Sequence, residues 1–220
     1  MTKYLSLLLF IGLSWGQPPI DTLWTKNNFT NYLCKDMVLC NDGGYLIITG
    51  SFPNGEVIKT DNLGNVVFNY TLNMEGTKGF QTPENDYLIA GNGSEGNLNI
   101  IKLNNNGELI WYESLETPSF FRISSITNHN NGYLISGNVQ DGTTYTVGYI
   151  VKINSNGVKD YEIYNEDYML YDFIFSVDDV SGAFGVIGEK FVDGYYTDIS
   201  LSYYIDGQFN NEHLYDFSEN

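Results

Sequence analysis

Residues 131–137 read Asn-Gly-Tyr-Leu-Ile-Ser-Gly, and variants of this phrase recur along the chain. The other copies read Gly-Tyr-Leu-Ile-Ile-Thr-Gly at 44–50, Asp-Tyr-Leu-Ile-Ala-Gly at 86–91 and Gly-Ala-Phe-Gly-Val-Ile-Gly at 182–188. Self-similarity at a regular period indicates a repeat architecture and outranks other sequence signals. The phrase therefore decides the fold, because each copy marks the same point of a structural unit.

A second phrase follows each of the first three copies, and in it a lysine stands five residues before a glycine. These pairs are Lys59 and Gly64, Lys102 and Gly107, and Lys152 and Gly157. Short apolar runs separated by Gly, Asn and Asp are typical of strands joined by tight turns. Four short strands per repeat of about 45 residues is the spacing of a propeller blade. The sequence predicts an all-β, β-propeller-like array of four four-stranded blades.

The first residues have the pattern of an export signal. Lys3 precedes the largely apolar residues 4–13, and Ser14 and Gly16 place small residues before Gln17. We therefore predict a signal peptide at 1–16 and a repeat domain at 17–220, with repeats at about 32–72, 73–115, 116–164 and 165–215. The expected location is secreted, cell-surface or periplasmic.

An extra strand is predicted ahead of the first repeat. Residues 21–26 resemble residues 108–113, which close the second repeat, and Trp24 and Trp111 fall at matching positions. This match favours packing of both tryptophans between blades. The spare strand leaves two arrangements open: an incomplete ring, or four closed blades with one strand at an edge.

Composition excludes several partner classes. The chain carries 27 acidic against 10 basic residues, a formal charge of −17. Nucleic-acid binding requires clustered Lys and Arg, so we expect no nucleic-acid partner. No segment is apolar enough over a sufficient length to be a transmembrane helix.

No residue set predicts a catalytic site, a metal site or a cofactor. His129 and His213 lack the spaced partners of a catalytic triad, and we expect both on the surface. The Asn- and Asp-rich turns at 61–64, 104–107 and 154–157 lack the ligand set of a calcium loop and fit hairpin turns better. Cys34 and Cys40 are expected to be two buried thiols, since an extended strand would hold them too far apart for a disulfide.

Ligand binding is predicted on one face. The distance from the glycine of the first phrase to the following lysine is 9, 11 and 15 residues, whereas the lysine-to-glycine turn is constant. We name the four strands of a blade a to d in chain order. The loops between strands b and c, and between strand d and the next blade, open on one face of a propeller. The a–b and c–d turns open on the other face. Binding is elaborated where loops vary, although neutral drift would give the same pattern. Tyr195 and Tyr196, in the last b–c loop, are the candidate ligand contacts.

Residues 41–47 and 58–66 resemble a repeat of the form DGGYIVAG…KLDSNGNIxW. It occurs in secreted, propeller-like proteins of Bacteroidetes-type bacteria, and the resemblance covers residues 21–215. The resemblance implies a propeller architecture and export, and most proteins of this kind have no assigned activity.

These observations favour an exported, non-catalytic module that binds a protein or a glycan through its variable-loop face. Two alternatives stay open: a truncated fragment of a longer secreted repeat protein, and a propeller-based hydrolase or lyase acting on glycans.

Overall fold

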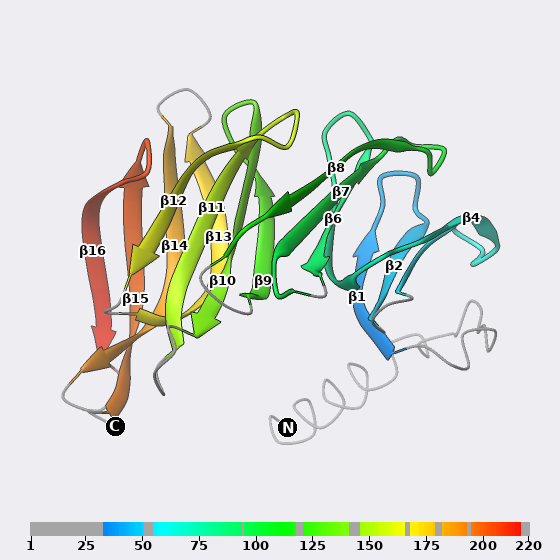
Figure 1. The fold of residues 1–220 in the computed structure, drawn as a ribbon. Coiled ribbons are helices and arrows are strands. Elements are labelled where there is room, and N and C mark those ends of the chain that lie inside the picture. The colour runs from blue at the N-terminus through cyan, green and yellow to red at the C-terminus, as the bar shows by residue number, and fades with distance from the viewer. Residues whose placement is uncertain are drawn as a thin grey trace, which may run out of the picture. The chain divides into compact units, whose positions relative to one another are not determined.

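A computed structural model describes residues 33–50, 55–93, 95–117, 121–140, 146–165, 168–178, 182–192 and 195–216. The regular secondary structure of these residues consists of β-strands alone, and the strands form four separate four-stranded sheets (Figure 1). The predicted signal peptide at 1–16 and the predicted extra strand at 21–26, with Trp24, lie outside the described residues.

Each sheet is an antiparallel meander in which strands a to d follow one another in the sequence. Sheet 1 contains β1 (Leu33–Leu39), β2 (Tyr45–Gly50), β3 (Glu56–Thr60) and β4 (Val66–Thr71). Sheet 2 contains β5 (Glu75–Gln81), β6 (Tyr87–Asn92), β7 (Leu98–Leu103) and β8 (Leu109–Leu115). Sheet 3 contains β9 (Phe121–Asn128), β10 (Gly132–Gln140), β11 (Thr146–Asn154) and β12 (Lys159–Asn165). Sheet 4 contains β13 (Tyr168–Asp178), β14 (Ala183–Val192), β15 (Tyr195–Ile205) and β16 (Gln208–Asp216). The four predicted repeats are therefore four sheets.

The c–d turns are hairpin turns, as the sequence predicts. In the first, the Asp61 carboxylate accepts hydrogen bonds from the backbone N–H groups of Leu63 (2.9 Å) and Asn65 (2.8 Å). Gly64 takes a φ of 75°, a region that favours glycine. Asn104 and Asn154 accept the equivalent bonds in sheets 2 and 3. The oxygen atoms that resemble calcium ligands in the sequence are thus engaged in forming the turn.

The glycine that ends the repeated phrase marks a close approach between strands a and b. A Cβ atom on Gly91 would collide with the carbonyl oxygen of Glu75, and one on Gly137 with that of Arg122. In both sheets the pairing register shifts nearby, as at a β-bulge. The repeated phrase is therefore part of the scaffold.

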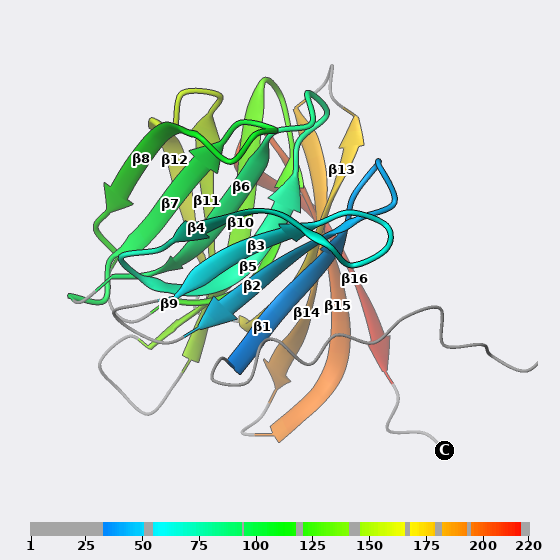
Figure 2. The same ribbon diagram turned by 90° about the vertical axis from the view of Figure 1, so that its right-hand side faces the viewer.

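Three apolar clusters lie between consecutive sheets, which pack side by side (Figures 1 and 2). Between sheets 1 and 2 the buried side chains include Leu46, Ile48, Tyr87 and Ile89. Between sheets 2 and 3 they include Leu88, Ile100, Phe121, Ile135 and Val151. Between sheets 3 and 4 they include Leu134, Ile150, Phe184 and Tyr204. Strands b and c are buried on both faces because each inner sheet is covered on both sides.

One contact repeats at each junction between sheets. An aromatic side chain of strand d lies against the turn glycine of the next sheet: Phe68 on Gly107, Trp111 on Gly157 and Tyr161 on Gly207. A Cβ on any of these glycines would come within 2.5 to 3.0 Å of the ring. Each glycine also has a positive φ, from 77° to 86°. The Trp111 indole N–H additionally donates to the carbonyl oxygen of Ser155, at 3.1 Å. This finding agrees with the expected packing of Trp111 between blades.

The first and last sheets each expose apolar side chains on the face that no neighbouring sheet covers. Met37 and Leu39 of β1 are 60% and 67% exposed, and Ile199 and Ile205 of β15 are each 41% exposed. Inner sheets bury the corresponding faces. These side chains are exposed because no sheet in the described part of the chain packs against that face.

The prediction of two buried thiols is wrong for Cys34. Cys40 is buried, but Cys34 is exposed, and both are free. The two positions share a parity, so a regular strand would direct them to one face. The register of β1 against β2 shifts between Cys34 and Asp36, and this bulge reverses the alternation.

Replacing Trp111 by alanine should lower the free energy of unfolding by about 2–4 kcal/mol, because the contact between the indole ring and the Gly157 turn, which joins sheets 2 and 3, is lost. Tyr112→Ala is the matched control, since Tyr112 is the next residue and is 48% exposed. We expect the control to change stability by less than about 1 kcal/mol. Urea denaturation followed by tryptophan and tyrosine fluorescence measures both. Equal effects of the two substitutions would contradict the proposed role of the contact.

Candidate functional site

Tyr195 and Tyr196 begin strand β15 instead of lying in a loop. Their backbones pair with Val192 and Phe191 of β14, so the b–c hairpin of sheet 4 extends further than the sequence predicts. Their side chains lie outside the described part of the chain. The ligand contact predicted for them stays a prediction.

The expectation of two surface histidines is wrong for His129. His129 is 1% exposed and packs edge-on against Phe184 of sheet 4, with ring centroids 5.4 Å apart. It lies in the a–b turn of sheet 3, which sheet 4 covers. His213 in β16 is exposed, as expected.

The lysines of the second phrase are buried, and each lies under the a–b turn of its own sheet. The Lys59 side chain is only 2% exposed. Its ammonium donates to both carboxylate oxygens of Asp42, at 3.0 and 2.8 Å, and to the carbonyl oxygen of Thr60, at 2.6 Å. These bonds compensate the cost of removing the charge from water. Hydrogen bonding to Lys59 holds the pKa of the Asp42 carboxyl below its ordinary value.

Lys152 in sheet 3 repeats this arrangement. Its ammonium donates to the carbonyl oxygen of Ile153 at 2.8 Å and lies 3.5 Å from both the carbonyl oxygen of Asn130 and the Asp160 carboxylate. Burial lowers the pKa of Lys152, and the attraction of Asp160 opposes that shift. In both sheets the side chain lies over a turn glycine, since a Cβ would approach the ammonium to 2.6 Å at Gly44 and 2.5 Å at Gly132.

Lys102 in sheet 2 departs from this arrangement. Its ammonium lies 3.2 Å from the Asp86 carboxylate and 5.8 Å from the centroid of the Tyr133 ring, which belongs to sheet 3. The contact with Tyr133 is a cation–π interaction. Burial alone would lower the pKa of Lys102, but the Tyr133 side chain and Asp86 raise it. Lys102 is therefore a cation at neutral pH and bridges two sheets.

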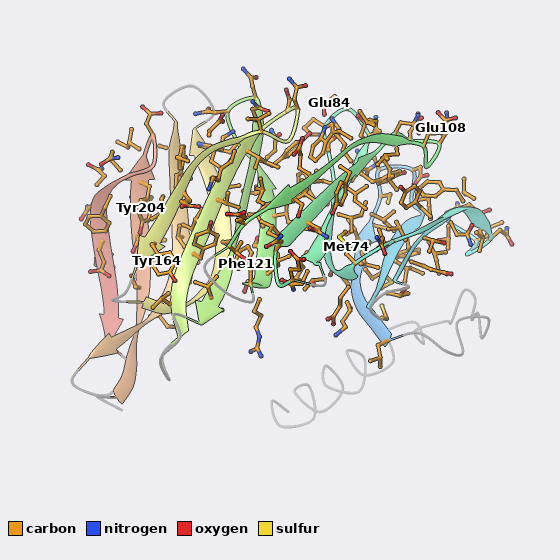
Figure 3. All side chains as sticks on the ribbon, viewed as in Figure 1. Met74, Glu84, Glu108, Phe121, Tyr164 and Tyr204 are labelled. Atoms are coloured by element: carbon orange, nitrogen blue, oxygen red, sulfur yellow. The ribbon has the colours of Figure 1, made fainter. Side chains whose placement is uncertain are left out.

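A polar pocket of about 670 Å³ opens between sheets 2 and 3, at the end of the sheets where the a–b and c–d turns lie. We call it the inter-sheet pocket, and its lining includes Glu84, Lys102, Asn128, Asn131, Tyr133 and Ser155. Figure 3 shows Glu84 at the edge of sheet 2, on the side of these turns. The volume lies within the range of small-molecule sites.

The lining groups combine donors and acceptors. A hydrogen bond from the Thr82 side chain holds the pKa of the Glu84 carboxyl below its ordinary value, so Glu84 is an acceptor at neutral pH. Lys102 supplies donors, and the asparagine amides supply both. Asn130 and Asn131 take positive φ values of 41° and 54°, which this residue tolerates better than most. The pocket can therefore hydrogen-bond a polar ligand from several sides.

A smaller polar hollow lies at the opposite, b–c loop end of sheet 2. It has a volume of about 160 Å³ and is lined by residues that include Glu95, Asn97 and Asn99. The buried side-chain oxygen of Asn99 has no hydrogen-bond partner in the described structure. Such an atom is commonly satisfied by an ordered water.

Across the ranges that the structure describes, no three His, Cys, Asp or Glu side chains gather closely enough to hold a metal ion. Glu162, from an acidic stretch of the sequence, instead accepts hydrogen bonds from the Tyr149 hydroxyl (2.6 Å) and the Lys159 ammonium (2.9 Å).

In the described residues no helix is long and apolar enough to cross a membrane.

The sequence does not predict the inter-sheet pocket, because the variation in loop length favours the opposite face. One signal was present: Asp86 occupies the place that Gly44 and Gly132 hold in the neighbouring repeats. That the substitution borders a pocket follows only from the packing of sheet 3 against sheet 2.

No protein-family model and no curated protein sequence matches the chain. Solved structures do match in fold. The Dos1 propeller shares 12% identity over 84% of this chain and 48% of its own, with a TM-score of 0.57. BBS1N, solved in complex with ARL6DN, shares 15% identity over 87% of this chain and 57% of its own, with a TM-score of 0.55.

An α-L-arabinofuranosidase from Clostridium thermocellum also matches, with 15% identity over 84% of this chain and 73% of its own and a TM-score of 0.50. The chain thus spans about half the length of the Dos1 and BBS1N chains and about three quarters of the arabinofuranosidase. The four antiparallel sheets and these similarities show that the described residues have a β-propeller-like fold.

Removing the Asp42 carboxylate should destabilise the protein, because it leaves the buried Lys59 ammonium without its anionic partner and with the carbonyl oxygen of Thr60 as its remaining acceptor. We expect Asp42→Ala to cost about 2 kcal/mol of unfolding free energy and the double variant Asp42→Ala/Lys59→Met to cost less.

The same ion pair makes stability depend on pH. The folded-state pKa of Asp42 is lowered, so the contribution of Asp42 to stability is present above the unfolded-state pKa and is lost as the pH falls through the folded-state value. Denaturation curves between pH 7 and pH 2 measure both effects. A double variant less stable than Asp42→Ala would contradict this account.

Proposed function

We propose that this chain is an exported, non-catalytic binding module built on a β-propeller-like scaffold, and that the inter-sheet pocket is its binding site. The observation that carries the proposal is the pocket itself. It has a volume suited to a small ligand, and it is lined by charged groups of sheet 2 and amide groups of sheet 3. Export is inferred from the leader-like residues 1–16.

The polar groups of the pocket favour binding over catalysis. The Lys102 ammonium is paired with Asp86 and carries a raised pKa, so it does not suit the role of a base. The lowered pKa of Glu84 likewise makes it a poor proton donor at neutral pH. General acid–base catalysis works best with groups whose pKa values lie near the working pH. Both groups are better suited to holding a ligand in place.

The proposed site lies at the turn end of the sheets, opposite the variable loops favoured by the sequence. Several of those loops, at 51–54 and 141–145 among others, lie outside the described residues. The turn end is built from short hairpins whose side chains are held by hydrogen bonds, such as the Asn154 turn that carries Ser155. Rigid positions of this kind reduce the ordering cost of binding.

Filling the pocket should abolish ligand binding. Ser155→Trp places a large ring at the pocket, while Asn105→Trp makes the same change at the corresponding turn position of sheet 2 and serves as control. We expect any ligand found by thermal-shift and glycan-array screening to bind the wild type and Asn105→Trp, and to bind Ser155→Trp at least about tenfold more weakly. Circular dichroism confirms that both variants fold.

Two results would contradict the proposal. Ligand binding that survives in Ser155→Trp would place the site elsewhere on the chain. Turnover of a bound glycan or ester by the wild type would show that the protein is an enzyme.

A further inference from the structure

We propose, building on the binding function above, that the inter-sheet pocket takes a neutral carbohydrate, and that Asp86 creates the site by holding the Lys102 ammonium in the pocket. The inference rests on a comparison of three equivalent lysines. Lys59 and Lys152 turn back onto the backbone of their own strand, whereas Lys102 points to the pocket.

The folded-away state depends on a glycine. In sheets 1 and 3 the lysine reaches the carbonyl oxygen of the residue that follows it, Thr60 or Ile153, at 2.6 and 2.8 Å. Gly44 or Gly132 lies directly against this path, and a Cβ at either position would collide with that same carbonyl oxygen. The absence of a side chain there is what allows the ammonium to fold back.

Repeat two has Asp86 where the other two repeats have glycine. Its side chain offers a carboxylate, which the Lys102 ammonium approaches to 3.2 Å. The ammonium is thereby carried to the junction with sheet 3, 5.8 Å from the centroid of the Tyr133 ring, where it lines the pocket. One substitution thus converts a structural lysine into a group that can reach a ligand.

In sheet 2 the carboxylate that pairs with the lysine comes from a different position of the a–b turn than in sheet 1. Asp42 of sheet 1, which pairs with Lys59, corresponds to Glu84 of sheet 2. Because Asp86 pairs with Lys102, Glu84 lines the inter-sheet pocket as a separate acceptor. The pocket consequently presents an ammonium and a carboxylate as two distinct groups, with the amides of Asn128 and Asn131 beside them.

This set of groups selects the ligand class. The charge of Lys102 is balanced by Asp86, so the remaining charge of the lining is the negative charge of Glu84, within a chain of net charge −17. Anionic ligands are therefore repelled. Sugar hydroxyls both donate and accept, so they can bond Glu84, Lys102 and the amides together. The polar lining offers an apolar ligand little burial.

The test uses glycan arrays and calorimetry with neutral oligosaccharides of glucose, galactose, mannose, xylose and arabinose, set against galacturonic and glucuronic acid oligosaccharides. Four proteins are compared: wild type, Asp86→Gly, Asp86→Asn and Lys102→Met. Asp86→Gly restores the glycine of the other repeats, so Lys102 is expected to fold back onto the carbonyl oxygen of Leu103. Asp86→Asn keeps a side chain in place and prevents that movement.

We expect the wild type to bind neutral and not acidic oligosaccharides. Asp86→Gly and Lys102→Met should bind at least about tenfold more weakly, the loss of one charged hydrogen bond, while Asp86→Asn, which keeps a side chain but loses the carboxylate, should bind with an affinity between those of Asp86→Gly and the wild type. Melting temperatures show that each variant folds, and a crystal structure of Asp86→Gly locates the ammonium.

The outcomes separate this inference from the broader function. Preference for acidic oligosaccharides or for a divalent cation, blocked by Ser155→Trp, would overturn the ligand class while the pocket remains a binding site. Unchanged binding in Asp86→Gly would overturn the role of Asp86. Binding of no carbohydrate at all would overturn the inference outright.

Discussion

The contact between a ring of strand d and a glycine of the next sheet is what joins the repeats. The ring can come this close to the turn only where the turn residue has no side chain, and the same residue takes a positive φ, so glycine is required for two reasons. Phe68, Trp111 and Tyr161 differ in size and chemistry, yet each reaches the following turn glycine. The apolar clusters between the sheets lie beneath these contacts. Loss of the contact would separate surfaces whose burial supplies most of the stability.

The buried lysines show how one scaffold position can serve two purposes. A buried ammonium is tolerated only with a full set of partners. In sheets 1 and 3 the carbonyl oxygen of the next residue is one of the partners, because a glycine leaves room for the side chain to turn back. In sheet 2 the partners are Asp86 and the ring of Tyr133, which belong to different sheets. All three sheets have a lysine at this position, but sheet 2 has Asp86 where the others have glycine. This difference places the Lys102 ammonium at the edge of the pocket.

Much of the fold follows from the repeated phrases. Their spacing predicts four sheets of four strands, and each predicted repeat corresponds to one sheet because the strands end at Gly, Asn and Asp turns. The predictions for Cys34 and His129 failed for a different reason. Cys34 changes face because β1 contains a bulge, and His129 is buried because sheet 4 covers its turn. Bulges and coverage depend on neighbouring strands and sheets that alternation along one strand does not record.

The repeat, the turn chemistry and the all-β class can be predicted from the amino-acid sequence, since these depend on residues close together in the chain. The sequence also contained the exchange of glycine for Asp86, without showing its consequence. Only the tertiary structure decided that this exchange lies beside sheet 3, where Tyr133, Asn131 and Ser155 complete a pocket. The physical reason is that a pocket forms between elements, and its shape depends on how two packed sheets meet.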